Sequence, residues 1–258
     1  MERSSNNATK FHCPARSLNF PFNWSDYSVG IVSSFSLFIP PRIINQIPLI
    51  NIHPSQLPQW RGPAPIQYSI LSGQERTGVS IIELHPKIID AGSILAQENF
   101  DIPNLIKYQE LEDQLAELGG KLAAQVLSNF ELYRKNKTEQ GHLGVSLSKK
   151  ISKSDGIISF KTDTFELISH KIRALSHQIP IKTVDLIPDK QVILEDILLD
   201  PPIVTNFIRY DKTIKAVLFP VNGKVIAVRQ FKIEGKSQIF PAGSFYSNYI
   251  KKTSLEIN

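Results

Sequence analysis

Asn51 and His53 close an apolar run, and a proline-rich loop follows them in the stretch INIHPSQLPQWRGPAPIQ, residues 50–67. An ordinary turn needs only glycine or proline, whereas this stretch also brings in the guanidinium of Arg61. Asp90 lies in a later turn, between two further predicted strands. A protonated imidazole and a carboxamide N–H can stabilise an oxyanion, and a carboxylate can hold the imidazolium and relay protons. These residue types indicate acyl-type transfer without a covalent enzyme intermediate.

Each of these residues also has a purely structural interpretation. His53 can be a hydrogen-bonded residue at a strand end, and Asn51 can be a turn former. Asp90 before Ala-Gly can make an ordinary Asx turn, and Arg61 can be a surface charge. From residue types alone, both interpretations stay open.

Composition sets the broad class of the protein. The chain has 258 residues, of which 41% are hydrophobic, and this suits one large domain or two modest ones. It has no apolar run of about 18 residues, so we expect no transmembrane helix and no membrane partner. The single cysteine, Cys13, excludes an internal disulfide and a thiolate zinc cluster, and we expect no metal.

The charge is divided unevenly between the two halves. Residues 1–133 contain 9 Lys/Arg and 12 Asp/Glu, a net charge of −3, while residues 134–258 contain 20 and 12, a net charge of +8. The basic half is therefore the part that would contact a polyanion such as a nucleic acid.

The periodicity predicts an α/β first half. Short β-rich runs predict strands at residues 29–35, 49–52, 77–84 and 93–100. The first is expected to be a buried parallel strand. Helices are predicted at residues 65–71 and, from an apolar stripe, at 107–133. Gly119 and Gly120 predict either a break or a close contact in the middle of that last helix.

The second half has the pattern of a small β-rich unit. After a predicted helix at 164–175, short β-like runs follow at residues 182–187, 192–199, 214–219 and 224–231, with a hairpin signal at Asn222-Gly223. Short strands with turn signals predict a small barrel or a sandwich. The domain organisation expected is therefore an irregular leader (1–28), an α/β unit (29–133), a polar linker (134–155) and a β-rich domain (156–258).

The motif residues also resemble a known family. INIHPSQLPQWRGPAPIQ, followed by TGVSIIELHPKIIDAGSILAQE at residues 77–98, resembles the methionyl-tRNA formyltransferases, which belong to the 10-formyltetrahydrofolate-dependent formyltransferases. The stretch FYSNY at residues 245–249 is similar to a closing motif of mitochondrial members. The resemblance covers about residues 29–258 and is strongest over 50–98.

The resemblance implies a fold, a reaction and a set of roles. The fold would be a partial Rossmann-like formyltransferase sheet followed by a small OB-like β-barrel that binds tRNA. The reaction would transfer the formyl group of 10-formyltetrahydrofolate to the amino group of initiator methionyl-tRNA, for translation initiation. Asn51 and His53 would polarise the formyl carbonyl, Asp90 would orient His53 and shuttle protons, and Arg61 would face the acceptor end of the tRNA. The folate site would be lined by Ser55, Gln56, Leu57 and Pro58.

The N-terminal part of the chain departs from the family pattern. The resemblance implies a Rossmann-type half upstream of residues 29–35, so we expect an N-terminally truncated form or an incomplete gene model with an exposed sheet edge. Two alternatives follow: the same residues could act on another amine or on water, or the chain could be a non-catalytic tRNA-binding remnant. The motif at 245–249 and the basic, Ser/Asn-rich leader favour the mitochondrial matrix, and we expect a monomer.

Overall fold

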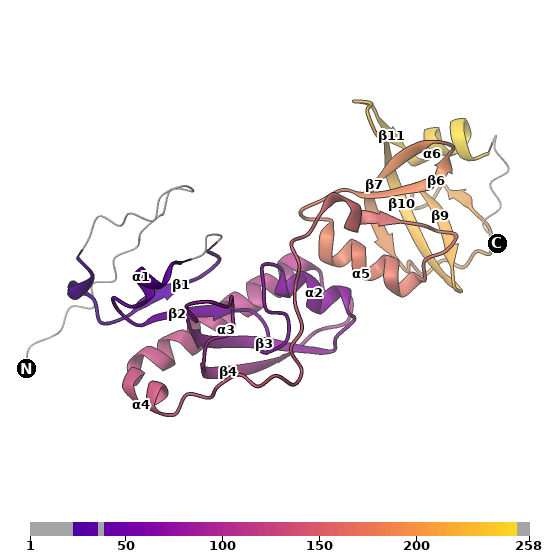
Figure 1. The fold of residues 1–258 in the computed structure, drawn as a ribbon. Coiled ribbons are helices and arrows are strands. Elements are labelled where there is room, and N and C mark those ends of the chain that lie inside the picture. The colour runs from indigo at the N-terminus through magenta and orange to yellow at the C-terminus, as the bar shows by residue number, and fades with distance from the viewer. Residues whose placement is uncertain (1–22, 36–38, 252–258) are drawn as a thin grey trace, which may run out of the picture.

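Two β-sheets lie toward opposite ends of the part of the chain that the structure describes, with helices between them (Figure 1). This structure is a computed structural model, and it describes residues 23–35 and 39–251. The first 22 residues of the predicted leader lie outside this part, and its end contains the 3-10 turn η1 (Trp24–Asp26). The mixed α/β class predicted from the sequence is confirmed.

The first sheet has four strands in the order of the chain: β1 (Gly30–Val32), β2 (Leu49–His53), β3 (Arg76–Glu83) and β4 (Ile94–Asp101). The first two strands pair in parallel, as predicted, and are connected through the short helix α1 (Pro41–Ile44). The prediction that the first strand is buried is wrong, since β1 lies at the edge of the sheet and Ile31 is 50% exposed. The other two pairs are antiparallel. All four predicted strands are therefore present, and β1 is shorter than its predicted run.

Helix α3 (Tyr108–Ser128) packs on β3 and β4 through the leucine-rich stripe that the sequence predicts. It continues through both glycines and ends at Ser128, and α4 (Phe130–Lys135) starts after Asn129. The predicted single helix at 107–133 is thus divided at Asn129. Gly119 makes a close contact instead of a break, since a Cβ there would lie 2.9 Å from the Cγ2 of Ile52 on β2.

The second sheet has seven strands, and its pairing order is β5-β6-β7-β10-β9-β8, with β11 added on β10. The strands are β5 (Ile157–Ile158), β6 (Ile181–Ile187), β7 (Lys190–Leu199), β8 (Arg209–Asp211), β9 (Ala216–Val221), β10 (Lys224–Ile233) and β11 (Ile239–Pro241). Asn222 and Gly223 form the predicted β9–β10 turn with positive φ angles of 48° and 77°. Within the described residues β5 and β8 are not paired with each other, so the predicted closed OB-like barrel is not confirmed.

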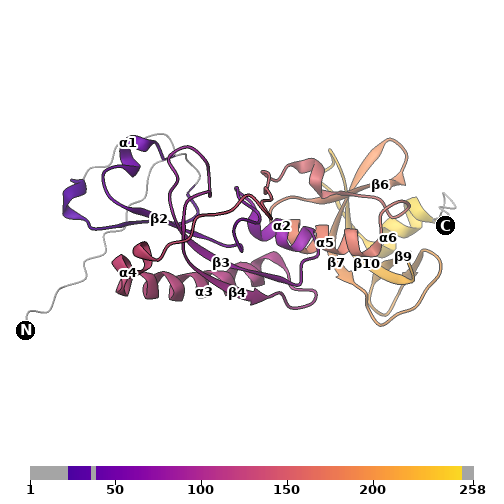
Figure 2. The ribbon, with the colours of Figure 1, turned by 60° about the horizontal axis from the view of Figure 1, so that its bottom comes forward.

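Helices α2 (Pro65–Leu71) and α5 (Phe165–Leu175) pack together between the two sheets (Figure 2). Buried Arg173 of α5 donates to the carbonyl of Ile106, 3.1 Å away, just before α3 begins. Hydrophobic residues from both sheets belong to one buried cluster. Three short elements complete the described chain: η2 (Lys153–Gly156), α6 (Ala242–Phe245) and the π-helical turn η3 (Tyr246–Ile250).

Candidate active site

Strand β2 places Asn51 and His53 on the same side of the first sheet, because side chains two residues apart in a strand project from the same face. The strand is the second of four, with β1 and β3 paired on either side of it. These two pairings hold the backbone that carries both side chains.

Asp90 reaches the same place from the loop between β3 and β4. Its backbone has a φ of 54°, in the left-handed region that Asp tolerates better than most residues. Gly92 lets the loop pass close to β3, since a Cβ there would lie 1.7 Å from the carbonyl oxygen of Glu83. The loop can therefore bend back toward β2 only with a glycine at this position.

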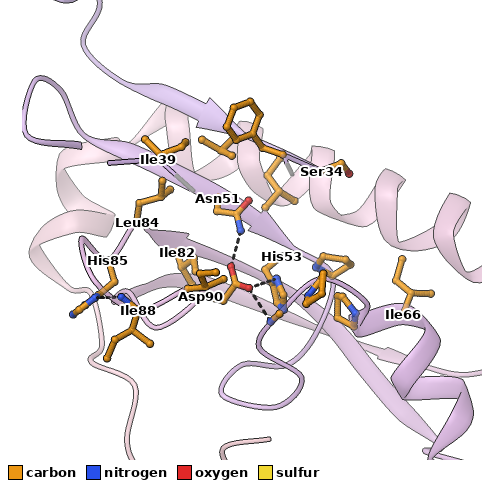
Figure 3. Close-up of a pocket in the computed structure, with 18 of the residues that line it drawn as sticks. Ser34, Ile39, Asn51, His53, Ile66, Ile82, Leu84, His85, Ile88 and Asp90 are labelled. Carbon is orange, nitrogen blue, oxygen red and sulfur yellow. Dashed lines mark hydrogen bonds and ion pairs between the residues drawn. The ribbon is translucent and has the colours of Figure 1, made fainter. Parts of the chain in front are cut away.

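The Asp90 carboxylate lies between the other two side chains (Figure 3). Asn51 Nδ2 donates to Asp90 Oδ1 at 3.2 Å, and Asp90 Oδ2 lies 3.6 Å from His53 Nδ1. The backbone N–H of Gly62 donates to the same Oδ2 at 2.9 Å. The structure thus brings together the three residues that the sequence predicted as a unit.

The surroundings of His53 determine which ring nitrogen carries its proton. Nε2 lies 3.0 Å from the carbonyl oxygen of Trp60, which can only accept, so Nε2 carries a hydrogen. Nδ1, which faces Asp90, is then the nitrogen that gains or loses a proton. His53 is only 3% exposed, and this burial lowers its pKa, while the charge of Asp90 and the Trp60 carbonyl partly oppose the change.

The three side chains line a cavity of about 620 Å³. Its other walls are largely apolar and include Val32, Ile39, Ile66, Ile82, Leu84 and Ile88. Tyr108 and Glu112, at the start of α3, add a polar wall, and the hydroxyl of Tyr108 donates to Glu112 Oε1 at 2.6 Å. A cavity of this size, lined by both apolar and polar side chains, suits a small organic ligand, for which pockets typically measure about 300–1,000 Å³.

The four residues predicted to line a folate site are not among those lining this cavity. Ser55 is buried and donates to the carbonyl of Gln59, while Gln56 donates to Asn99 on β4. The N–H of Leu57 donates to Ser80 on β3, and the carbonyl of Pro58 accepts from the N–H of Ser146. These residues hold the loop against β3, β4 and the linker, and their predicted place in a folate site stays a prediction.

Arg61 is also absent from the cavity lining. Its Nε and Nη2 donate to Oε1 of Gln140 at 3.0 and 2.7 Å, respectively. The guanidinium is therefore hydrogen-bonded to a side chain of the predicted linker.

The linker contributes three side chains to the site that sequence reasoning missed. Gln140 Nε2 donates to the carbonyls of Asp90 and Gly92, both at 2.8 Å. Ser146 Oγ accepts from the N–H of Trp60, and Ser148 Oγ accepts from the N–H of Ala64. A polar segment without hydrophobic periodicity gave no signal for these contacts.

Within residues 23–35 and 39–251, no cluster of three or more His, Cys, Asp or Glu side chains has the arrangement of a metal site. No helix in those same ranges is both long and apolar enough to span a membrane.

The chain is similar to several known proteins. Residues 25–127 match the family model described as formyl transferase. The mitochondrial methionyl-tRNA formyltransferase of Homo sapiens is 31% identical over 246 residues, which cover 89% of this chain and 62% of the human protein. The methionyl-tRNA formyltransferase of Wolbachia pipientis is 47% identical over 106 residues, covering 40% of this chain and 35% of that protein.

Among solved structures, HypX from Aquifex aeolicus in complex with tetrahydrofolic acid is similar to this chain. It has a TM-score of 0.68 and 17% identity, and the match covers 87% of this chain and 40% of HypX. This likeness shows a shared fold. The chain spans about three fifths of the length of the mitochondrial relatives. Residues 25–127 match the formyl transferase family, in agreement with the resemblance inferred from the sequence.

Proposed function

We propose that this chain transfers the formyl group of 10-formyltetrahydrofolate to the amino group of initiator methionyl-tRNA. The observation that carries the proposal is the convergence of Asn51, His53 and Asp90 in one cavity. The matches to the human and Wolbachia methionyl-tRNA formyltransferases support the choice of acceptor.

The cavity is the place in this chain that we assign to the folate. Its volume of about 620 Å³ and its largely apolar walls suit a flat heterocycle, and Asn51 and His53 lie beside Asp90 at one part of the wall. When bound there, 10-formyltetrahydrofolate supplies the formyl carbon. Ser55–Pro58 would then act indirectly, by holding the loop that carries Trp60 and Gly62 against His53 and Asp90.

Asn51 and His53 have different roles in this proposal. Asn51 Nδ2 carries a second N–H besides the one donated to Asp90, and it can stabilise the oxygen that becomes negative as the amine attacks. His53 is neutral at rest because burial lowers its pKa. Its Nδ1, together with Asp90 Oδ2, can therefore receive the proton that the attacking amine loses and return it to the departing nitrogen. This changes the role inferred from the sequence, in which the imidazole was protonated from the start.

The second half of the chain is the part that we assign to tRNA binding. Its net charge of +8 favours phosphate contacts, so affinity should fall steeply as the salt concentration rises. The mitochondrial names of several relatives support a mitochondrial location for this chain. The monomeric state stays a prediction, which light scattering can test.

The test is formyl transfer by the purified chain, with 10-formyltetrahydrofolate and charged initiator tRNA as substrates. We expect His53→Asn and Asp90→Asn to lower kcat on the order of 10²- to 10⁴-fold, the usual contribution of a positioned acid–base group. Asp113→Asn is the matched control for Asp90→Asn, because Asp113 is exposed on α3 and does not line the cavity. Full activity of His53→Asn, or no transfer by the wild-type chain, would refute the proposal.

A further inference from the structure

Residues 138–148 of the predicted linker are fixed along the loops that carry the active site. Thr138 exchanges backbone hydrogen bonds of 2.7 and 2.9 Å with Ile94 at the start of β4. Ser146 and Ser148 bracket Arg61: the Arg61 N–H donates to the Ser146 carbonyl at 3.0 Å, and its carbonyl accepts from the Ser148 N–H at 2.8 Å. The segment is thus attached at both ends, and the linker follows the first sheet back from α4 (Figure 1).

Gln140 lies between these attachments, and both ends of its amide are used. Its Nε2 donates to two carbonyls of the catalytic loop, those of Asp90 and Gly92. Its Oε1 accepts from two nitrogens of Arg61. Carbonyls can only accept and a guanidinium can only donate, so this amide has a single orientation that satisfies all four contacts.

The loop that carries Asp90 needs such an external support. Asp90 has a positive φ, and its neighbours Ile88 and Ile89 are largely exposed, so a hydrophobic core does not hold this part of the loop. Asp90 Oδ2 is nevertheless only 3.6 Å from His53 Nδ1. A displacement of about 1 Å in such a site can lower a rate on the order of 10²-fold.

We propose that Gln140 is a positioning residue that holds the Asp90 carboxylate against Asn51 and His53, and that Arg61 anchors Gln140 instead of binding substrate. This inference rests on the proposed function for its catalytic consequence. Gln140 touches neither Asn51 nor His53 in the contacts found among the described residues, so its effect is transmitted through the Asp90 backbone. The linker is then a structural part of the active site as well as a connection to the basic half.

The central test is Gln140→Met, which keeps the length of the side chain and removes both polar ends. We expect kcat for formyl transfer to fall on the order of 10- to 100-fold, with little change in KM for tRNA. Gln125→Met is the matched control, because Gln125 is exposed on α3 and outside the cavity lining. Gln140→Glu is a second variant: it can still accept from Arg61 but cannot donate to the two carbonyls, so it should be as impaired as Gln140→Met.

Arg61 provides a test that separates anchoring from substrate binding. Arg61→Met should lower kcat as Gln140→Met does, and the double variant should be no worse than either single variant, because both remove the same support. If Arg61 instead binds the substrate, Arg61→Met should raise KM for tRNA, and the effect of Arg61→Met should add to that of Gln140→Met.

A titration of the His53 imidazole by NMR provides a readout that needs no activity. The carboxylate of Asp90 raises the pKa of His53, so moving it away in Gln140→Met should shift the His53 titration to lower pH. If the wild-type chain transfers no formyl group, the proposed function fails and this titration alone decides the positioning role. Gln140→Met with wild-type kcat, or with an unchanged His53 titration in a folded protein, overturns the inference.

Discussion

The two adjacent glycines of α3 allow a test of how the helix supports the catalytic strand. Replacing either glycine by alanine removes the same backbone freedom and should stabilise a helix by roughly 1 kcal/mol. A Cβ at Gly120 has no neighbour within 4 Å, whereas a Cβ at Gly119 lies 2.9 Å from Ile52 Cγ2 and 3.4 Å from Val79 Cγ1. The two variants therefore differ only in what the new methyl group contacts.

The size of the difference follows from this geometry. Gly120→Ala should gain about 1 kcal/mol in the free energy of unfolding, or roughly 2–4 °C in Tm for a chain of this size. At Gly119 the same gain is opposed by overpacking against two β-branched residues, which typically costs about 1–3 kcal/mol. Since the helix-propensity gain cancels between the variants, Gly119→Ala should be less stable than Gly120→Ala by about 1–3 kcal/mol.

Urea unfolding of the wild type and both variants, followed by circular dichroism, measures this difference. Ile52 lies between Asn51 and His53 on β2, so Gly119→Ala should also lower formyl transfer, while Gly120→Ala should leave it unchanged. Equal stabilisation by the two substitutions would refute the reasoning, because it would mean that the contact between Gly119 and β2 is not tight.

Three further outcomes are expected. Ser80→Ala should lower the free energy of unfolding by about 1–3 kcal/mol, because the buried N–H of Leu57 loses its acceptor. Urea unfolding measures this loss, and removing the hydroxyl of an exposed serine should cost less. Thr164→Ala should cost about 1 kcal/mol in the same assay, because its hydroxyl caps α5 by accepting from the N–H of Leu167. Acidification from about pH 7.5 to about pH 5.5 should destabilise the wild type more than His53→Asn. Burial lowers the pKa of His53 in the folded protein, whereas the pKa of His53 in the unfolded chain is about 6.5. The unfolded chain therefore binds the proton first as the pH drops, and the free energy of unfolding falls. Identical pH dependence in the two proteins would contradict this last expectation.

Local patterns were enough to predict much of the fold. Alternating or continuous apolar runs mark β2, β3 and β4, and the leucine-rich stripe marks α3, because α3 buries one face and β3 is buried along nearly its whole length. Asn222-Gly223 predicts the β9–β10 hairpin because the turn between these strands requires two residues with positive φ. Asn51, His53 and Asp90 could be predicted as a unit from their positions at strand ends and loops.

The tertiary structure decided the properties that depend on residues distant in the chain. The hydrogen bonds from Arg61 to Gln140 cannot be read from the loop that carries Arg61, because Gln140 lies 79 residues away in the sequence. Closure of the second sheet depends on whether its two terminal strands meet, and no local turn signal specifies that. Residue type and strand period therefore indicate which side chains can carry the chemistry. The packing of distant segments decided which of them reach the cavity, because hydrogen-bond partners are selected by position in space.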